Sequence, residues 1–598
     1  MSQQEQQDKS QYFYRASAAD FLKIPDCPVA YWASPQMLIN FENETPLGDL
    51  ADVKRGMTTS DNNQFIRFWP EVSFNRSYQT AKNDEEAVAS KAKWFPYSKG
   101  GGYRKWYGFM EFFINWEESG RDVINFAKTI NQSYTRTIVN VPYYFLPSVG
   151  FSYITSGPFS MRWIPEGALY DSGGPGVFAD EEMRKFILAC MNSTPAMKLL
   201  KILNPTINLQ IADVVRLPIP AYKNLGAIKA IEELVPELVN LSKSDWDSYE
   251  TSWNFTSHPF ISVDNHEPYL KSIYRGVRGR WEATTLNFKS LETENNRFFI
   301  EAYGLQKELV SEVPPEEITL TCNPYYRYGA NRSEPEYEAL LQCDTLKELL
   351  SYTIGCMMGR YSIDKPGLIL ASQGETLQDY LNQIPNPRFM PDSDAILPLT
   401  DQEWFTDDVT NRVREFVKVV WGEETLQENL AFIAESLCLH AIKQKKGEGA
   451  MDTIRRYLST QFYKDHLKTY KKRPIYWLFS SGKEKAFECL VYLHRYNEST
   501  LARMRTEYVT PLMGKYDAQH SLLLEQKTDA SPAQQRELEK ELKALEKKQT
   551  ELRAFDEQLK HYADMRIKLD LDDGVKVNYG KFGNLLAEVK AVTGDKGE

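Results

Sequence analysis

Hydrophobic positions near the carboxyl end of the chain recur every seventh residue. The polar, charged stretch 533–565 carries four leucines at this spacing and a fifth beside them: Leu538, Leu545, Leu552, Leu559 and Leu542. A seven-residue repeat places apolar side chains along one face of a long helix. A second helical pattern covers 499–527, and Ser531-Pro532 supplies an N-cap followed by proline at the first helical position. The pattern predicts a helical hairpin whose two helices pair with each other, because both lie in one chain.

The middle of the chain has apolar residues separated by three and four positions. Examples are Leu346, Leu349, Leu350 and Ile354, and again Leu430, Ile433 and Leu437. This spacing is typical of helices with one buried face. We therefore expect most of 226–490 to be helical, with loops at Pro314-Pro315 and across 385–398.

The first 225 residues have a different pattern. Short β-rich runs such as 137–141 and 151–154 alternate with many glycines and prolines, and an amphipathic helix containing Pro236 is expected around 228–241. The sequence thus predicts an α+β multidomain protein. Its parts are an irregular α/β domain over 1–225, a helical connector over 226–335, a mostly helical domain over 336–495, the helical hairpin over 496–570 and a tail over 571–598.

Length and charge refine this picture. At 598 residues the chain is too long for one core, and roughly three to five domains are expected. The net charge of −11 argues against a uniformly basic coat for nucleic acid. Residues 54–136 nevertheless concentrate basic side chains: Arg55, Arg67, Lys91, Lys93, Lys99, Arg104, Lys105 and Arg136. A basic cleft on an acidic body is expected.

Cysteine and histidine usage gives little sign of a metal site. The seven cysteines include no Cys-x-x-Cys pair, which fits a reducing cytoplasm. The seven histidines lack the spacing of metal ligands on a helix, so we expect them to be surface or capping residues. No apolar stretch approaches the length needed to cross a bilayer. A cytoplasmic protein without membrane contact is predicted.

Two basic, glycine-containing runs carry the candidate chemistry. The first is Lys54-Arg55-Gly56-Met57-Thr58-Thr59-Ser60-Asp61-Asn62-Asn63, and the second is Lys99-Gly100-Gly101-Gly102-Tyr103-Arg104-Lys105-Trp106-Tyr107-Gly108. Arg and Lys neutralise phosphate, Asn and Gln can bond to an adenine edge, aromatic rings stack on bases, and glycine lets the backbone approach closely. Asn204-Pro205-Thr206-Ile207-Asn208-Leu209-Gln210 adds further amides. Together these runs predict a surface that holds DNA.

These runs resemble the target-recognition region of the large adenine-specific DNA methyltransferases called PglX, from BREX phage-defence systems. The similarity continues in the same order along the chain, through 11–15, 28–32, 204–206, Gln210, 250–255, 300–305, 323–329, 359–367 and 472–482. It covers essentially the whole chain and matches the carboxyl-terminal half of the family. The chain is therefore expected to choose the DNA sequence, while a methyltransferase domain that would precede residue 1 transfers the methyl group.

The resemblance also implies cofactors, partners and a site. S-adenosylmethionine is expected in the absent methyltransferase domain and no cofactor in this chain. Expected partners are double-stranded DNA, the amino-terminal methyltransferase half, other BREX proteins and phage-encoded inhibitors that mimic DNA. The predicted DNA-binding residues are Lys54, Arg55, Thr58, Thr59, Asn62, Asn63, Lys99, Tyr103, Arg104, Lys105, Trp106, Asn208 and Gln210. No catalytic or metal-binding residue is predicted.

Each run also has a purely structural interpretation. Asp61 and Asn62 can cap a helix that begins near Phe65, the second run can form a surface hairpin with stacked aromatics, and the Asn204 run can form a capped turn. Asp171-Ser172-Gly173-Gly174-Pro175 resembles a serine-protease nucleophile loop, but no histidine precedes it, so a glycine-rich turn is predicted. Neither glycine cluster has the Lys-Ser/Thr ending of a P-loop.

Asn323-Pro324-Tyr325-Tyr326 is similar to the catalytic Asn-Pro-Pro-Tyr loop of adenine methyltransferases. Its third residue is tyrosine, and no glycine-rich loop for S-adenosylmethionine precedes it, so a catalytic role is not predicted. Two rival functions stay open. One is the recognition half of a fused type II restriction-modification enzyme, and the other is a protein-interaction scaffold of a defence complex.

Overall fold

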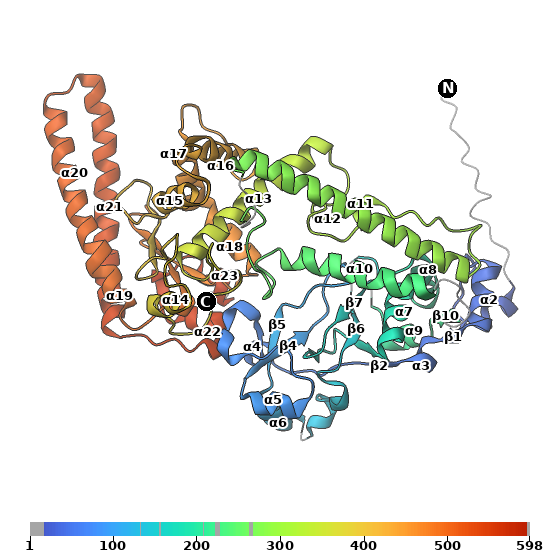
Figure 1. Ribbon diagram of the computed structural model, residues 1–598. Coiled ribbons are helices and arrows are strands. Elements are labelled where there is room, and N and C mark those ends of the chain that lie inside the picture. The colour runs from blue at the N-terminus through green and yellow to red at the C-terminus, as the bar shows by residue number, and fades with distance from the viewer. Residues whose placement is uncertain are drawn as a thin grey trace, which may run out of the picture. The chain divides into compact units, whose positions relative to one another are not determined.

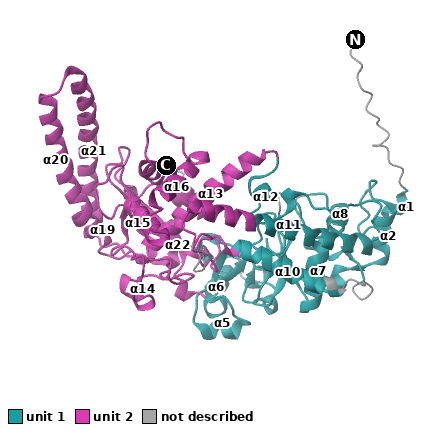
Figure 2. Cartoon of the chain, turned by 45° about the horizontal axis from the view of Figure 1, so that its top comes forward, with its two compact units in different colours: residues 1–66, 78–246, 281–330 teal, residues 67–77, 247–280, 331–598 magenta. Residues whose placement is uncertain are grey.

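The computed structural model describes residues 17–131, 133–154, 157–206, 208–221, 228–261 and 267–594. Residues 11–15, Ile207 and His266, which entered the sequence predictions, lie outside these ranges. The chain divides into two compact units (Figure 2). The first unit comprises 1–66, 78–246 and 281–330, and the second comprises 67–77, 247–280 and 331–598. The hairpin and the tail predicted at the carboxyl end both belong to the second unit.

Small sheets form the centre of the first unit. One sheet is antiparallel with the order β2-β9-β6-β7. In the other, β5 pairs antiparallel and β8 pairs parallel with β4. The strands are β1 (Thr45–Pro46), β2 (Asp52–Lys54), β4 (Trp94–Ser98), β5 (Phe112–Asn115), β6 (Ser148–Phe151), β7 (Met161–Ile164), β8 (Leu169–Tyr170), β9 (Gly176–Phe178) and β10 (Pro218–Ile219), with β3 (Ile66–Phe68) at the boundary of the two units.

Helices cover the antiparallel sheet of the first unit. Helix α7 packs on β6 and β7, and Figure 1 shows α8 and α10 beside it. The helices are α1 (Ala18–Phe21), α2 (Pro35–Asn43), α3 (Leu47–Leu50), α4 (Asn62–Phe65), α5 (Asp84–Ser90), α6 (Glu117–Asn131), α7 (Glu181–Met191), α8 (Thr194–Leu203), α9 (Ile211–Val215), α10 (Ile228–Asp247) and α12 (Pro324–Tyr328), together with α11 (Leu270–Ala302), whose first part up to Arg280 belongs to the second unit. Helix α10 contains Pro236, as predicted. Ile187, Leu199 and Leu238 are fully buried in the shared core.

The second unit is mostly helical but contains an unexpected sheet. Strands β11 (Ile396–Pro398), β13 (Glu488–Tyr492) and β12 (Tyr476–Ser480) form an antiparallel sheet in this order. The helices are α13 (Glu334–Met357), α14 (Leu377–Gln383), α15 (Val409–Trp421), α16 (Leu426–His440), α17 (Ala450–Tyr457), α18 (Tyr463–Thr469), α19 (Thr500–Arg503), α20 (Thr510–Thr528), α21 (Pro532–Asp564), α22 (Gly574–Gly580) and α23 (Val589–Thr593). The predicted apolar positions of α13 and α16 are buried where these two helices pack together.

The predicted helical hairpin is confirmed. Helices α20 and α21 pack against each other, and Ser531 and Gln534 form a capping box with Pro532 at the first position of α21. Four of the five predicted leucines are buried, and Leu538 is half-buried. A π-helical turn, Met504–Val509, joins α19 to α20. The hairpin is therefore an internal antiparallel pair, as the spacing predicts.

The tail after the hairpin packs into the second unit. The ring of Trp477 on β12 lies 5.2 Å from that of Tyr579, and Phe479 forms a β-bridge with Leu586. Residues 67–77 join the same unit, because the Trp69 indole donates to the carbonyl of Thr251 at 2.8 Å. Among the described residues, no single helix is long and apolar enough to span a membrane, and the bent pair α7 and α8 meets that criterion only when joined.

Candidate nucleic-acid interface

Three of the predicted DNA-binding residues meet in one open pocket of the first unit. The pocket has a volume of about 610 Å³, and Arg55, Lys99 and Gln210 all line it. These residues come from the two basic runs and from the amide run, which are far apart in the sequence. The remaining lining comes from Gly101, residues 152–154, residues 171–173 and residues 211–212. The fold thus brings together the three segments that the sequence predicts as one site.

Backbone hydrogen bonds fix the first run against the segment after β8. The Met57 amide donates to the Tyr170 carbonyl at 2.8 Å, and the Ser172 amide donates to the Met57 carbonyl at 2.9 Å. These bonds belong to a parallel bridge between Met57 and Asp171. Arg55 is therefore held next to the 171–173 turn, which completes the pocket wall.

The second run is fixed in the same way on the opposite side. The Gly101 amide donates to the Ser152 hydroxyl at 2.9 Å, and that hydroxyl donates back to the Gly101 carbonyl at 2.8 Å. The Tyr153 amide donates to the Gly173 carbonyl at 3.0 Å. The amide run closes the pocket, because the Leu209 amide donates to the Tyr153 carbonyl at 2.9 Å.

The glycines of these runs permit close backbone packing. A Cβ at Gly56 would lie 1.8 Å from the carbonyl oxygen of Tyr170, and one at Gly174 would lie 2.5 Å from the amide nitrogen of Gly100. Gly100 also has a φ of +76°. Such distances and such a backbone angle exclude side chains. The glycines therefore build the pocket and need not contact a ligand themselves.

Two cationic side chains face this pocket. Arg55 is exposed and donates one hydrogen bond, to the Arg136 carbonyl at 3.2 Å. Lys99 is half-buried, with its amino group 6.0 Å from the centroid of the Phe112 ring. Burial lowers the pKa of Lys99, and the charge of Asp171 partly offsets this effect. A partly desolvated ammonium group is stabilised when an anion approaches it.

The carboxylate of Asp171 is occupied by internal hydrogen bonds. Its oxygens accept the Tyr97 hydroxyl at 2.9 Å and the Gly173 amide at 2.7 Å. The Gly174 amide also donates to the Asp171 carbonyl, which confirms the predicted turn. Asp171 is only 9% exposed, so it shapes the turn and leaves the cationic side chains to dominate the pocket.

Residues 58–63, the second part of the first run, do not line the pocket. Asp61 caps α4 by accepting the amides of Asn63 and Gln64, so the predicted cap is confirmed, although the helix begins at Asn62. The Thr59 side chain is buried and its hydroxyl donates to Asn62 at 2.7 Å. Thr58 and Asn63 are exposed. Lys54 pairs with Asp52 at 2.8 Å, and this hydrogen bond raises the pKa of Lys54.

The amide run forms a capped turn and also presents side chains. The Asn204 amide group donates to the Asn208 carbonyl at 2.8 Å, and the Gln210 amide donates to Asp213 at 2.8 Å at the start of α9. The side chains of Asn208 and Gln210 are exposed, and that of Gln210 lines the pocket. Both interpretations of this run are thus compatible.

The centre of the second run does not lie at the surface, which corrects the prediction for Arg104, Lys105 and Trp106. Their exposed fractions are 1%, 2% and 0%. The Arg104 guanidinium lies 2.8 Å from Asp245. Lys105 Nζ lies 2.7 Å from Glu292 Oε2, and the Trp106 indole donates to Glu292 Oε1 at 2.6 Å. Because every charge is buried and paired, these three side chains hold the first unit together, and we remove them from the candidate interface.

Lys105 stays charged despite its complete burial. Burial lowers the pKa of this lysine, but the neighbouring Glu292 carboxylate outweighs that effect and raises the pKa above its usual value. Tyr103, which precedes Arg104 in the same run, is partly buried, and its carbonyl accepts the Tyr326 hydroxyl. Only Lys99 at the start of the run therefore faces the pocket as a charged group.

The sequence did not single out the middle of the pocket wall. Tyr153 and Ile154 line the pocket, and Ile154 is 64% exposed. Their only sequence signal is a short β-rich run, which any strand can share. The 171–173 turn was recognised as a turn, but its place beside Gly101 depends on pairing between distant segments.

Two further sequence expectations concern possible chemistry. Asn323 is fully buried, and its side-chain oxygen caps α12 by accepting the Tyr325 amide at 3.2 Å. Its side-chain nitrogen donates to the carbonyls of Pro315 and Ile318 at 2.7 and 2.8 Å, so the side chain cannot reach a base. The histidines were expected to be surface or capping residues, and the surface alternative is wrong for His258, His466 and His494, which are at most 3% exposed. Burial lowers the pKa of each to about 3.

Comparison with known proteins identifies homologues. The chain is 46% identical over 583 residues to the adenine-specific methyltransferase BrxX of Escherichia coli O9:H4 (strain HS), and these aligned residues cover 97% of the chain. It is 36% identical over 581 residues to the adenine-specific methyltransferase PglX of Lacticaseibacillus casei (strain Zhang), and this alignment covers 95% of the chain. The chain is a homologue of the BrxX and PglX adenine-specific methyltransferases. The predicted resemblance is thereby confirmed.

The BrxX and PglX relatives are much longer than this chain. The chain spans about half of their length, 46% of BrxX and 45% of PglX. No protein-family model matches the chain. These relatives therefore show homology, whereas the function of the matched portion is a matter for proposal.

Proposed function

We propose that this chain is the sequence-specific, double-stranded DNA-recognition portion of a BREX adenine-specific DNA methyltransferase. The convergence of Arg55, Lys99 and Gln210 on one pocket carries the proposal. Arginine and lysine neutralise backbone phosphate, and glutamine can make two hydrogen bonds to an adenine edge. The combination of positioning cations with a base-reading amide is the combination that DNA recognition needs.

The shape and charge of the pocket support an interface with DNA. The two cations face an open pocket, while the Asp171 carboxylate is turned to internal donors. Tyr153 and Ile154 add an aromatic and an apolar surface for sugar or base. The exposed Thr58, Asn62, Asn63 and Asn208 lie on the same segments and extend the interface beyond the pocket.

Methyl transfer belongs, in this proposal, to the half of the relatives that this chain does not match. That half would bind S-adenosylmethionine and receive the target adenine after it leaves the duplex. Its association with this chain, with other BREX proteins and with phage inhibitors that mimic DNA follows from the same proposal. Host DNA marking and phage defence would be the biological outcome.

A binding and transfer assay with the purified 598-residue chain tests this function. We expect filter binding of duplex DNA that weakens steeply with salt, because released counterions drive phosphate contacts. We expect no methyl incorporation from labelled S-adenosylmethionine. Methylation by the chain alone would contradict the division of labour, and absence of DNA binding would favour the scaffold alternative.

A further inference from the structure

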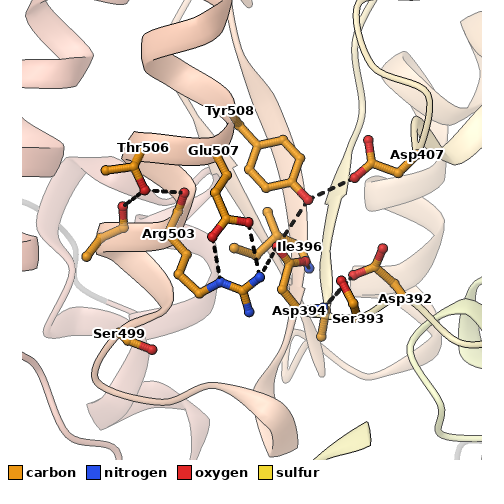
Figure 3. Close-up of polar contacts among 12 residues, drawn as sticks. Asp392, Ser393, Asp394, Ile396, Asp407, Ser499, Arg503, Thr506, Glu507 and Tyr508 are labelled. Atoms are coloured by element: carbon orange, nitrogen blue, oxygen red, sulfur yellow. Dashed lines mark hydrogen bonds and ion pairs between the residues drawn. The ribbon is translucent and has the colours of Figure 1, made fainter.

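A cluster of carboxyl groups anchors the helical run that leads into the hairpin (Figure 3). Asp392 and Asp394 lie in the loop before β11, and Asp407 lies just before α15. Facing them are Arg503 at the end of α19 and Tyr508 in the π-helical turn. All five residues belong to the second unit. Turns of π-helix inside longer helices often mark functional positions.

The hydroxyl of Tyr508 lies between two of these carboxyl groups. Its oxygen is 2.9 Å from Asp407 Oδ2 and 3.1 Å from Asp394 Oδ2. A phenol carries one hydrogen, so it satisfies one carboxylate while its lone pairs face the other. Protonating one carboxyl group removes this conflict, because that group then donates a hydrogen bond of its own. The geometry therefore calls for one more proton than ionised carboxylates supply.

Positive charge near the cluster is too scarce to replace that proton. Arg503 lies 3.4 Å from Asp394 but also pairs with Glu507 at 2.9 Å, and its side chain is 40% exposed. Arg495 donates to the main-chain carbonyls of Asp392 and Ser393 at 2.8 and 3.0 Å. The remaining titratable neighbours are Asp408, which pairs with Arg455, and the Cys489 thiol on β13.

We propose that Asp394 is protonated in mildly acidic solution, and that this proton fastens the π-helical turn of Tyr508 to the loops before β11 and α15. The Asp394 side chain is only 2% exposed, so water cannot stabilise its negative charge. The ligand of this site is a proton. Its release leaves two negatively charged carboxylates close to each other, beside the π-helical turn that precedes α20. The hairpin is thereby anchored more firmly in acid than in alkali.

The titration of these groups agrees with the geometry. Burial, followed by the neighbouring Asp392, raises the pKa of Asp394 from 3.8 to about 7. Burial also raises the pKa of Asp407. A carboxyl group with a raised pKa binds its proton in the folded state at a pH where the opened state has lost it. The stabilisation therefore falls as the pH rises between about 4 and about 7, and changes little at higher pH.

Hydrogen exchange across 500–512 tests this anchor. After correction for the intrinsic exchange rate, we expect the opening equilibrium of this segment to increase roughly tenfold between pH 6 and pH 8, from the pKa difference between the folded and opened states. Asp394→Asn keeps hydrogen-bonding groups but cannot titrate. In this variant the opening equilibrium of 500–512 should therefore lose the step, that is, the increase between pH 6 and pH 8. Asp529→Asn removes an exposed carboxylate from the hairpin loop and should keep the step. An equal step in Asp394→Asn and the unaltered protein would overturn the proposal.

A second variant covers the case in which Asp394→Asn does not fold. Asp407→Asn removes a negative neighbour, so it should lower the pKa of Asp394 and move the exchange step to lower pH. The infrared carbonyl band of a protonated carboxyl group, measured at pH 6, should disappear over the same pH range. An exchange step whose midpoint does not move in Asp407→Asn, or a missing band in the unaltered protein, would contradict the protonation of Asp394.

Discussion

Arg104, Lys105 and Trp106 show at the scale of single residues how a basic run can serve the interior. Their composition matches a DNA-binding loop, but each side chain meets a buried acceptor from another segment. Asp245 and Glu292 lie 141 and 187 residues further along the chain. No local pattern reveals such partners, so a sequence-based assignment of exposed charge fails here. Arg55 and Lys99, which lack such enclosure, remain at the pocket as predicted.

We expect the free energy of unfolding to depend strongly on the buried pair of Lys105 and Glu292 in the first unit. Lys105→Met would leave the Glu292 carboxylate buried without its partner, which costs about 3–5 kcal/mol of unfolding free energy. Urea denaturation measures this loss, with the exposed Lys82→Ala as the control. A change below about 1 kcal/mol would show that the pair is less important than its burial indicates.

At the scale of elements, tight packing between two backbone segments determines how the walls of the pocket are placed. The segment after β2 and the turn after β8 approach so closely that Gly56 has no room for a Cβ. Glycine in the sequence suggests such a site but cannot say which backbone lies opposite. The glycine-rich runs were therefore predicted as ligand-facing loops, whereas the structure uses them mainly to bring the two walls together.

Gly56→Ala is expected to distort this wall. Its new methyl carbon would overlap the carbonyl of Tyr170, whereas a Cβ at Gly102 would make an ordinary contact of 3.5 Å with Phe109. Overpacking of this kind typically costs about 1–3 kcal/mol or more. Thermal unfolding should thus show a clear loss for Gly56→Ala and little change for Gly102→Ala. Equal effects of both substitutions would argue against close packing as the reason for the glycine.

The hairpin is the element that the sequence predicts best, because its seven-residue repeat is local. Leu552 on α21 is fully buried, whereas Leu522 on α20 is 52% exposed. Leu552→Ala should therefore cost about 2–5 kcal/mol through lost burial and a cavity. Leu522→Ala should change stability by less than about 0.5 kcal/mol. Denaturation monitored by helical circular dichroism compares the two, and similar losses would refute the assigned faces.

At the scale of the whole molecule, the sequence gives the fold class and the long helices but not the division of the chain. Residues 67–77 lie between segments of the first unit, yet Trp69 and Glu71 bind within the second unit. The sheet formed by β11, β12 and β13 was also missed, because its strands are short and β11 is far from β12 and β13 in the sequence. Both features depend on contacts between distant residues, which periodicity does not encode.

Three buried histidines should make the second unit sensitive to acid. The pKa values of His258, His466 and His494 lie near 3 in the folded state because of burial. The unfolded chain binds a proton at each below about pH 6.5, so stability is lost as the pH falls through this value and further toward 3. The raised pKa values of Glu250 and Asp394 oppose part of this loss. Urea denaturation should show lower stability at pH 5 than at pH 7, and higher stability at pH 5 would contradict the neutral histidines.

Duplex binding by Arg55→Ala/Lys99→Ala tests whether the pocket of the first unit holds DNA phosphate. The dependence of log affinity on log salt should become shallower by about 0.9 for each lost phosphate contact. Lys82→Ala, an exposed lysine outside the pocket, should keep the full slope. Circular dichroism must show the same folded state for all three proteins. We expect weaker binding and a flatter slope for the double variant alone, and an unchanged affinity and slope would contradict DNA binding at this pocket.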